Sequence, residues 1–230
     1  MKLKHILPIG CMWLAFGLKA SAITVFSENF DGPSPYSDGA AIPGGFNIIQ
    51  YGKWYKETNG GTVIASTATS LSPSRSLALT VAANGSYALA WGTFGLNNST
   101  TTPVSTPIIA RLKFRLSHPN GSGTEVTTIG VSGTGGSEKF QVRLGVNGRA
   151  QVHFSGNSQD IGAINPNTWY FLEILIPQLG PVGDPGPLCS VSLFSNNNGV
   201  RGTWMGTAYP HWYGPFVPHS GLKGLHSLLR

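Results

Sequence analysis

Residues 140–154 read Phe-Gln-Val-Arg-Leu-Gly-Val-Asn-Gly-Arg-Ala-Gln-Val-His-Phe. Apolar and polar side chains alternate on both sides of Asn147-Gly148, which is the period of a strand with one face in a core. Asn and Gly tolerate the positive φ that both central residues of a type I′ turn require. The segment therefore predicts an antiparallel β-hairpin, and its pattern sets the fold class.

Similar short runs of β-branched and aromatic residues return along the chain, separated by Gly, Asn, Ser and Pro. Eight of them lie at residues 23–30, 62–67, 76–82, 87–94, 108–116, 126–131, 169–176 and 188–194. No window of about eleven residues keeps a helical period between capping signals. We predict an all-β protein, a β-sandwich of two antiparallel sheets packed face to face, for which plain sandwich and jelly-roll topologies both fit.

Two of these runs carry more information about their surroundings. Arg111, Lys113 and Arg115 are the polar positions of residues 109–116, which predicts a strand with one wet and one dry face. Residues 169–176 are apolar at nearly every position, which predicts a strand covered on both sides.

The N-terminal segment has the order of a secretory signal peptide. Lys2 and Lys4 precede an apolar run at residues 6–18, and Ala20-Ser21-Ala22 follows it. The run is shorter than the ~20 residues that cross a hydrocarbon core. We expect cleavage after Ala22, a secreted, periplasmic or cell-surface protein, and no membrane insertion after cleavage.

Removal of the signal peptide also removes Cys11, so Cys189 is the one cysteine of residues 23–230. No disulfide framework can therefore form within the mature chain. Cys189 lies in an alternating run, and we expect a small buried hydrophobe there.

Lys and Arg exceed Asp and Glu by 15 to 9 in the whole chain, but residues 23–200 carry nine of each sign. This balance does not favour a nucleic-acid partner.

Four short motifs carry a family resemblance. They are Glu28-Asn29-Phe30-Asp31-Gly32, Pro43-Gly44-Gly45-Phe46, Ser74-Arg75-Ser76-Leu77-Ala78-Leu79 and Asn167-Thr168-Trp169-Tyr170. We expect the β-sandwich domain at residues 23–202, of which residues 23 to about 200 resemble bacterial secreted domains of the concanavalin A-like lectin and glucanase superfamily, the laminin-G-like members most. The resemblance implies a jelly roll that binds glycan or a cell-surface protein through its loops, often with calcium at the rim. Glu28 and Asp31 are the candidate calcium ligands.

The chain departs from that pattern at residues 203–230, which hold Pro, His and aromatic residues without alternation. We expect an irregular tail there in place of a closing strand. Either a disordered or partner-dependent extension or a truncated or frame-shifted end would explain it, and we favour the second.

Aromatic side chains are the remaining signal for a ligand, because sugar rings stack on Trp and Tyr. The candidates are Tyr51, Trp54 and Tyr55. For Trp54 and Tyr55, core and binding roles are equally compatible with the flanking lysines. No two acidic residues have the strand spacing that a pair of glycosidase carboxylates needs. We therefore expect a non-catalytic recognition or adhesion module, with a divergent glucanase-type hydrolase and a purely structural envelope protein as alternatives.

Overall fold

The computed structural model contains thirteen β-strands and no helix among the residues that it describes. These are residues 39, 54–68, 71, 76–81, 87–93, 108–117, 127–132, 138–176, 188–211 and 224–229. For residues 54–57, 81, 87–93, 108, 131–132, 138–139, 146 and 224–229 the description covers the backbone alone. None of the described segments is a helix long and apolar enough to cross a membrane.

The strands follow one another at short intervals along the chain. They are β1 (Trp54–Asn59), β2 (Gly61–Ser66), β3 (Ser76–Val81), β4 (Tyr87–Thr93), β5 (Ile108–Arg115), β6 (Thr127–Ser132), β7 (Glu138–Val146), β8 (Arg149–Phe154), β9 (Asn157–Ala163), β10 (Trp169–Ile176), β11 (Ser190–Asn197), β12 (Val200–Ala208) and β13 (Gly224–Leu229).

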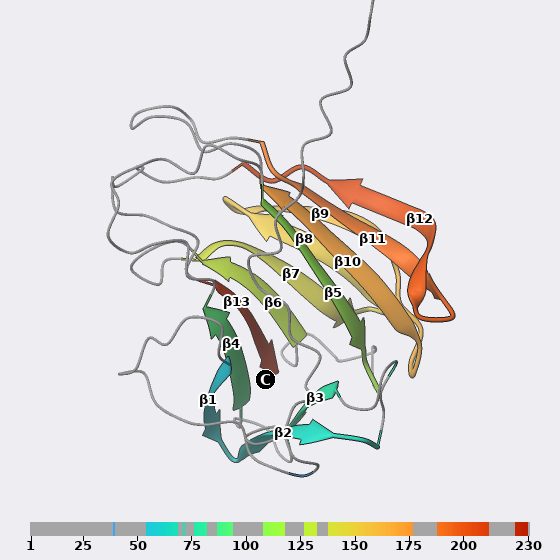
Figure 1. Cartoon of the computed structure of the whole chain (residues 1–230). Helices are drawn as coiled ribbons and strands as arrows, with labels where there is room; N and C mark the ends of the chain where they lie inside the picture. Colours follow the sequence, from blue (N-terminus) through green and yellow to red (C-terminus); the bar gives the residue numbers. More distant parts are fainter. Residues whose placement is uncertain are drawn as a thin grey trace, which may run out of the picture.

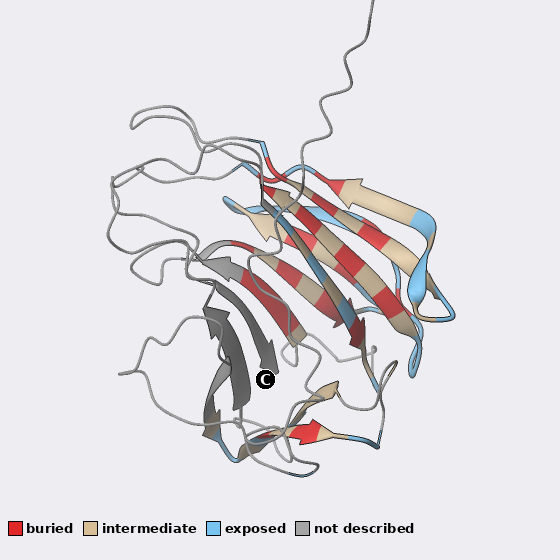
Figure 2. Cartoon of the chain, in the orientation of Figure 1, coloured by how far each residue is buried: buried red, intermediate tan, exposed pale blue. Residues whose placement is uncertain are grey.

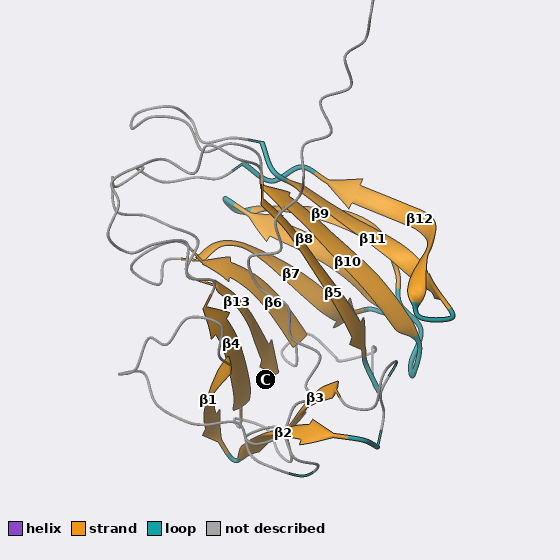
Figure 3. Cartoon of the chain, in the orientation of Figure 1, coloured by secondary structure: helices purple, strands orange, loops and turns teal. Residues whose placement is uncertain are grey.

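All of these strands pair antiparallel, in three sheets. A seven-stranded sheet has the order β1-β4-β13-β6-β7-β8-β9, a four-stranded sheet the order β12-β11-β10-β5, and β2 and β3 form a two-stranded sheet. The four-stranded sheet lies over the β6–β9 part of the seven-stranded sheet, with β1, β4 and β13 beyond it (Figures 1 and 3). The predicted antiparallel β-sandwich is thus confirmed, while the jelly-roll topology stays a prediction.

Tight turns set the register of the long hairpins. β7 and β8 join through Asn147-Gly148, whose φ values are 51° and 68°, as predicted from the sequence. Ser155-Gly156 joins β8 to β9, and Asn198-Gly199 joins β11 to β12, in both cases with positive φ at both residues. These φ signs match the type I′ turn, whose twist suits the flanking strands.

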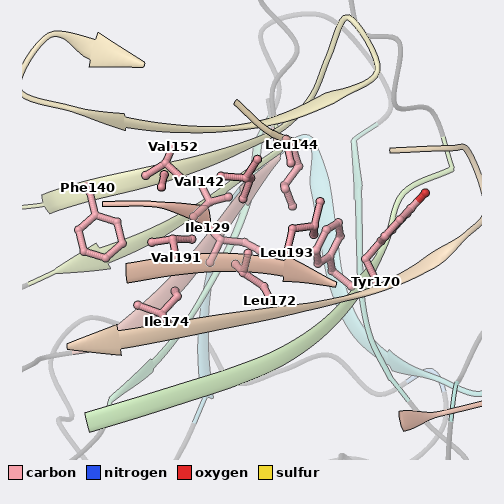
Figure 4. Packing of buried hydrophobic residues seen from close by; sticks show 14 of the residues in the cluster. Ile129, Phe140, Val142, Leu144, Val152, Tyr170, Leu172, Ile174, Val191 and Leu193 are labelled. Carbon is pink, nitrogen blue, oxygen red and sulfur yellow. The ribbon is translucent and has the colours of Figure 1, made fainter. Parts of the chain in front are cut away.

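The core lies between the seven-stranded and four-stranded sheets. Alternate residues of β7, β8, β10 and β11 point into it and are fully or almost fully buried (Figure 2). Figure 4 shows these side chains meeting between the two layers; they include Phe140, Val142, Leu144, Val152, Leu172, Ile174, Val191 and Leu193. Burying each such side chain contributes about 1.5–3 kcal/mol, so this cluster is the main source of stability in the described sandwich.

Tyr170 anchors the start of β10 inside this core. Its ring stacks on Phe114 with centroids 5.7 Å apart, and its hydroxyl oxygen accepts a hydrogen bond of 2.8 Å from the backbone N–H of Asn165. The turn before it is held by Asn167, at φ 57°, whose backbone N–H donates to the Leu116 carbonyl at 2.7 Å. These contacts give the segment Asn167–Tyr170 a structural reason for its composition.

The expectation that residues 169–176 are covered on both sides is wrong. Tyr170, Leu172, Ile174 and Ile176 are buried, but the alternate residues of β10 are only half-buried. The run is apolar at nearly every position because Trp169, Phe171 and Leu175 lie on the outer face of the four-stranded sheet, where they remain partly exposed. The prediction for residues 109–116 holds, since Arg111 and Lys113 are exposed and Phe114 is buried.

The expectation of an irregular tail is wrong for residues 203–208 and 224–229, which lie in strands. β12 continues to Ala208, and β13 pairs with β4 on one side and with β6 on the other. The sequence does not show a period of two in these strands, because β12 is bulged and β13 has only six residues. The signal peptide, its cleavage site after Ala22 and the strand predicted at residues 23–30 lie outside the described residues.

Candidate binding face

The outer face of the four-stranded sheet carries an aromatic row flanked by charged side chains. Lys113 of β5, Phe171 of β10, Phe194 of β11 and Trp204 of β12 are successive cross-strand neighbours. Because directly paired residues share one face of a sheet, the four lie in a line about 14 Å long, three strand spacings of about 4.8 Å. We call the surface formed by this row and its neighbours the aromatic–basic face; it comprises Arg111, Lys113, Arg115, Phe171, Glu173, Ser192, Phe194, Arg201, Trp204 and Thr207.

Trp204 reaches this face because β12 is bulged. Gly206 pairs with the inward-facing Leu193, so regular alternation would turn Trp204 inward as well. The register shifts between Leu193 and Phe194, and the extra residue is Met205, which packs against the core. A bulge of this kind redirects the side chains that follow it. Trp204 therefore lies opposite Phe194 and is 61% exposed.

Hydrogen bonds fix the indole of Trp204 in place. Its Nε1–H donates to Thr207 Oγ1 at 2.9 Å, and Thr207 Oγ1 lies 2.7 Å from Ser192 Oγ. One side of the ring system is thus anchored while most of it remains in solvent. An exposed but preoriented aromatic ring loses little conformational freedom on binding a ligand.

Cations lie over the two phenyl rings of the row. Lys113 Nζ is 5.2 Å from the centroid of the Phe171 ring, and the Arg201 guanidinium carbon is 4.7 Å from that of Phe194. Both distances are in the range of a cation–π interaction. Trp204 is therefore the most exposed aromatic side chain of the row, and Lys113 and Arg201 place positive charge over the neighbouring phenyl rings.

Glu173 ties two strands of this face to β10. Its Oε2 accepts a hydrogen bond from Arg111 Nε at 2.7 Å and one from Arg201 Nη1 at 3.1 Å. Glu173 is the better shielded partner, with a side chain 23% exposed against 66% for Arg111. The carboxylate thus holds two guanidinium groups against the sheet.

The described carboxylates do not form a glycosidase pair. Among acidic residues whose side chains the structure describes, Glu173 lies on the four-stranded sheet and Asp160 on β9 of the seven-stranded sheet. Arginine binds each of them, Asp160 through Arg149 at 2.6 Å. Two carboxylates about 5 Å apart and facing one substrate would be needed for retaining hydrolysis, and these two do not provide that geometry.

A polar cluster lies on the other sheet, where His153 of β8 faces Ser158 of β9. His153 Nε2 is 3.3 Å from Ser158 Oγ and 3.4 Å from Gln151 Oε1. Burial, and secondly the charge of Arg143, lowers the pKa of His153, which favours the neutral ring. If Nε2 carries the proton that Gln151 accepts, it cannot also take the Ser158 proton, so this arrangement supports hydrogen bonding more than nucleophile activation.

The residues singled out from the sequence are only partly covered by the structure. Trp54 and Tyr55 open β1, where their backbones pair with Gly92 and Trp91, and their proposed binding role stays a prediction. Tyr51, Glu28 and Asp31 lie outside the described residues, as does any calcium site they form. Within the described part of the chain, no group of three or more His, Cys, Asp or Glu could hold a metal ion.

Cys189 fits the prediction of a small buried hydrophobe. It has no exposed surface, and burial raises the pKa of its thiol to about 12. At neutral pH the group is a thiol, and the thiolate is the reactive form. The structure therefore gives Cys189 a packing role.

Sequence reasoning missed the aromatic–basic face. The sequence pattern places Trp204 in the expected irregular tail, and Phe171 in a strand expected to be covered on both sides. One available signal was Asn198-Gly199, which has the same turn chemistry as Asn147-Gly148 and predicts a further strand after it. The bulge that turns Trp204 outward leaves no comparable mark in the sequence.

The chain matches no protein-family model and no curated protein sequence. Among solved structures it is similar to a sialidase, with a TM-score of 0.50 and 10% identity over 76% of this chain. It spans 13% of the sialidase chain. It also aligns with a carbohydrate esterase from the Shiga toxin-encoding bacteriophage phi24B, with a TM-score of 0.41 and 14% identity over 76% of this chain and 88% of the esterase chain.

These likenesses concern the fold alone. The strand order, together with the likeness to the sialidase, defines the class as an antiparallel β-sandwich protein.

Proposed function

We propose that this chain is an exported, non-catalytic recognition module that binds glycan through the aromatic–basic face. The observation that carries the proposal is the in-register row across all four strands, which ends in an exposed and hydrogen-bonded Trp204. The resemblance to concanavalin A-like and laminin-G-like domains supports the same reading, although in those domains loops are the expected binding elements.

The chemistry of the face suits a sugar ring. A sugar presents C–H groups on its faces and hydroxyl groups around its edge. An aromatic ring offers an apolar platform for the first, and Arg111, Arg201 and Thr207 place donors and acceptors beside it for the second. A row about 14 Å long across the sheet provides room for more than one linked ring.

The alternative of a hydrolase receives less support from the described side chains. Glu173 and Asp160 are separated on two sheets, and Arg residues bind both. A binding module needs no further group, because an exposed aromatic ring and hydrogen-bonding side chains lie on one face.

Replacing Trp204 by Ala tests the proposal. We expect the whole chain to bind at least one glycan of an immobilised panel, and Trp204→Ala to weaken that binding by about thirtyfold. This estimate corresponds to about 2 kcal/mol for a central aromatic contact. Titration calorimetry with the retained glycan measures the change.

Tyr209→Ala is the matched control. Tyr209 is 54% exposed, but it follows β12 at the β9 edge, where its backbone N–H donates to Gln159 Oε1 at 3.0 Å. This variant should bind as the unchanged chain does. Equal affinity of the Trp204 variant, at an unchanged unfolding midpoint, would rule out this face as the glycan site.

A further inference from the structure

The charge of the aromatic–basic face is strongly unbalanced. Arg111, Lys113, Arg115 and Arg201 contribute four cations, and Glu173 contributes its single carboxylate, so the described part of this face has a net charge of +3. By contrast, residues 23–200 as a whole carry nine cations and nine acidic groups. Positive charge is therefore concentrated around the aromatic row.

The guanidinium groups keep donors for a ligand. Arg111 and Arg201 each give Glu173 Oε2 one hydrogen bond, while their side chains are 66% and 51% exposed. A guanidinium has five N–H donors in a planar fork that fits a carboxylate or a sulfate oxygen pair. One hydrogen bond from each arginine to Glu173 leaves four N–H donors on each guanidinium that the carboxylate does not bind.

Lys113 and Arg201 are also held close to the sheet. Each lies over a phenyl ring of the row, and the two rings belong to paired residues of adjacent strands. A cation that folds over an aromatic ring is kept near the platform rather than extended into solvent. Positive charge thus flanks the exposed indole of Trp204 on the side of β11 and β10.

We infer that the aromatic–basic face selects acidic polysaccharides, in which carboxylate or sulfate groups accompany the stacking sugar ring. The inference rests on the proposed function and names its ligand class. A neutral glycan would use the stacking surface but would leave three positive charges uncompensated. An acidic one uses both, because its anionic groups lie at the ring edge, where the cations are.

The test compares polymers that share a sugar backbone and differ in charge. The whole chain is titrated with polygalacturonate and its fully methyl-esterified form, with dextran sulfate and dextran, and with a panel of neutral glycans. The first pair isolates carboxylate and the second isolates sulfate. Single-stranded DNA is included as a polyanion that is not a polysaccharide. It tests whether negative charge alone is sufficient for binding.

Charge variants give opposite expected shifts. Arg111→Gln should weaken binding of the acidic polymer about two- to fivefold, the range of an exposed charge contact. Glu173→Gln should strengthen it about two- to fivefold, because it releases both guanidinium groups from an internal competitor. Arg143→Gln, which removes a half-buried cation from the other sheet, should leave affinity unchanged, and thermal unfolding checks that each variant folds.

The outcomes separate the two proposals. Preference for an acidic polymer over its neutral counterpart, with the expected shifts in the two variants, supports the inference. Equal binding of charged and neutral forms, or weaker binding by Glu173→Gln, overturns the inference and leaves the glycan proposal standing. Binding to no polysaccharide of either kind overturns both, and tighter binding of DNA than of the acidic polymers at this face also overturns the inference.

Discussion

Asp160 shows how a single residue couples the hairpin edge to pH. Arg149 binds it with two hydrogen bonds of 2.6 Å, and the Gly162 N–H donates to Oδ1 at 2.8 Å. Hydrogen bonding from Arg149 is the main cause that lowers the pKa of Asp160, with smaller contributions from Gly162 and from the Arg149 charge, against an opposing effect of burial. The charged form is therefore favoured in the folded chain.

This lowered pKa gives a pH dependence of known sign. The stabilisation is present above the unfolded pKa of about 3.9 and is lost as pH falls through the lower folded value. Asp160→Asn should therefore flatten the acid side of the stability profile, as measured by urea unfolding between pH 2 and pH 7. The effect should be small because the side chains are 39% and 45% exposed.

Arg149→Gln provides the companion test. It removes the main cause of the lowered pKa without removing the carboxylate, so the same acid limb should flatten. If the Arg149 variant kept the full acid dependence of the unchanged chain, the pair would not be its source.

At the scale of elements, β12 is shaped by a close approach to β9. A Cβ built on Gly206 would lie 2.6 Å from the Ile161 carbonyl oxygen, a backbone atom that cannot swing aside. Gly206 also precedes Thr207, which holds the Trp204 indole. Glycine at this position thus lets β12 close the edge of the sandwich next to the aromatic–basic face.

Gly206→Ala should destabilise the chain by about 1–3 kcal/mol, the usual cost of forcing extra volume into a packed site. The free energy of unfolding in urea measures this cost. Thr203→Ala, at an exposed position of the same strand, should change it by less than about 0.5 kcal/mol. An unchanged Gly206 variant would show that β9 and β12 do not approach so closely.

Elements were predictable where local chemistry was complete. Asn147-Gly148 between two alternating runs is sufficient to predict β7 and β8, because turn and pattern agree. β12 has an equally clear turn at Asn198-Gly199, but its bulge at Met205 breaks the period of two. The candidate site was missed for that reason, since its exposed Trp204 depends on the bulge and its phenyl rings resemble core residues.

At the scale of the whole molecule, β13 joins distant parts of the chain. It lies between β4 and β6, with Leu225 paired to Gly92 on one side and to Val131 on the other. Residues 224–229 are short and contain no β-branched residue, so local propensity does not predict a strand there. The strand forms because β13 pairs with the edges of both β4 and β6. Pairing across such sequence distances cannot be inferred from a local pattern.

Ser227→Pro tests this central position in the full chain. A proline in a central strand removes a ladder hydrogen bond, and Ser227 pairs with Ala90 and with Ile129. We expect a loss of about 2–3 kcal/mol in the free energy of unfolding and faster hydrogen exchange of the β4 and β6 amides. Ser227→Ala keeps the N–H and should leave exchange in both strands slow, whereas slow exchange in the proline variant would place β13 outside the sheet.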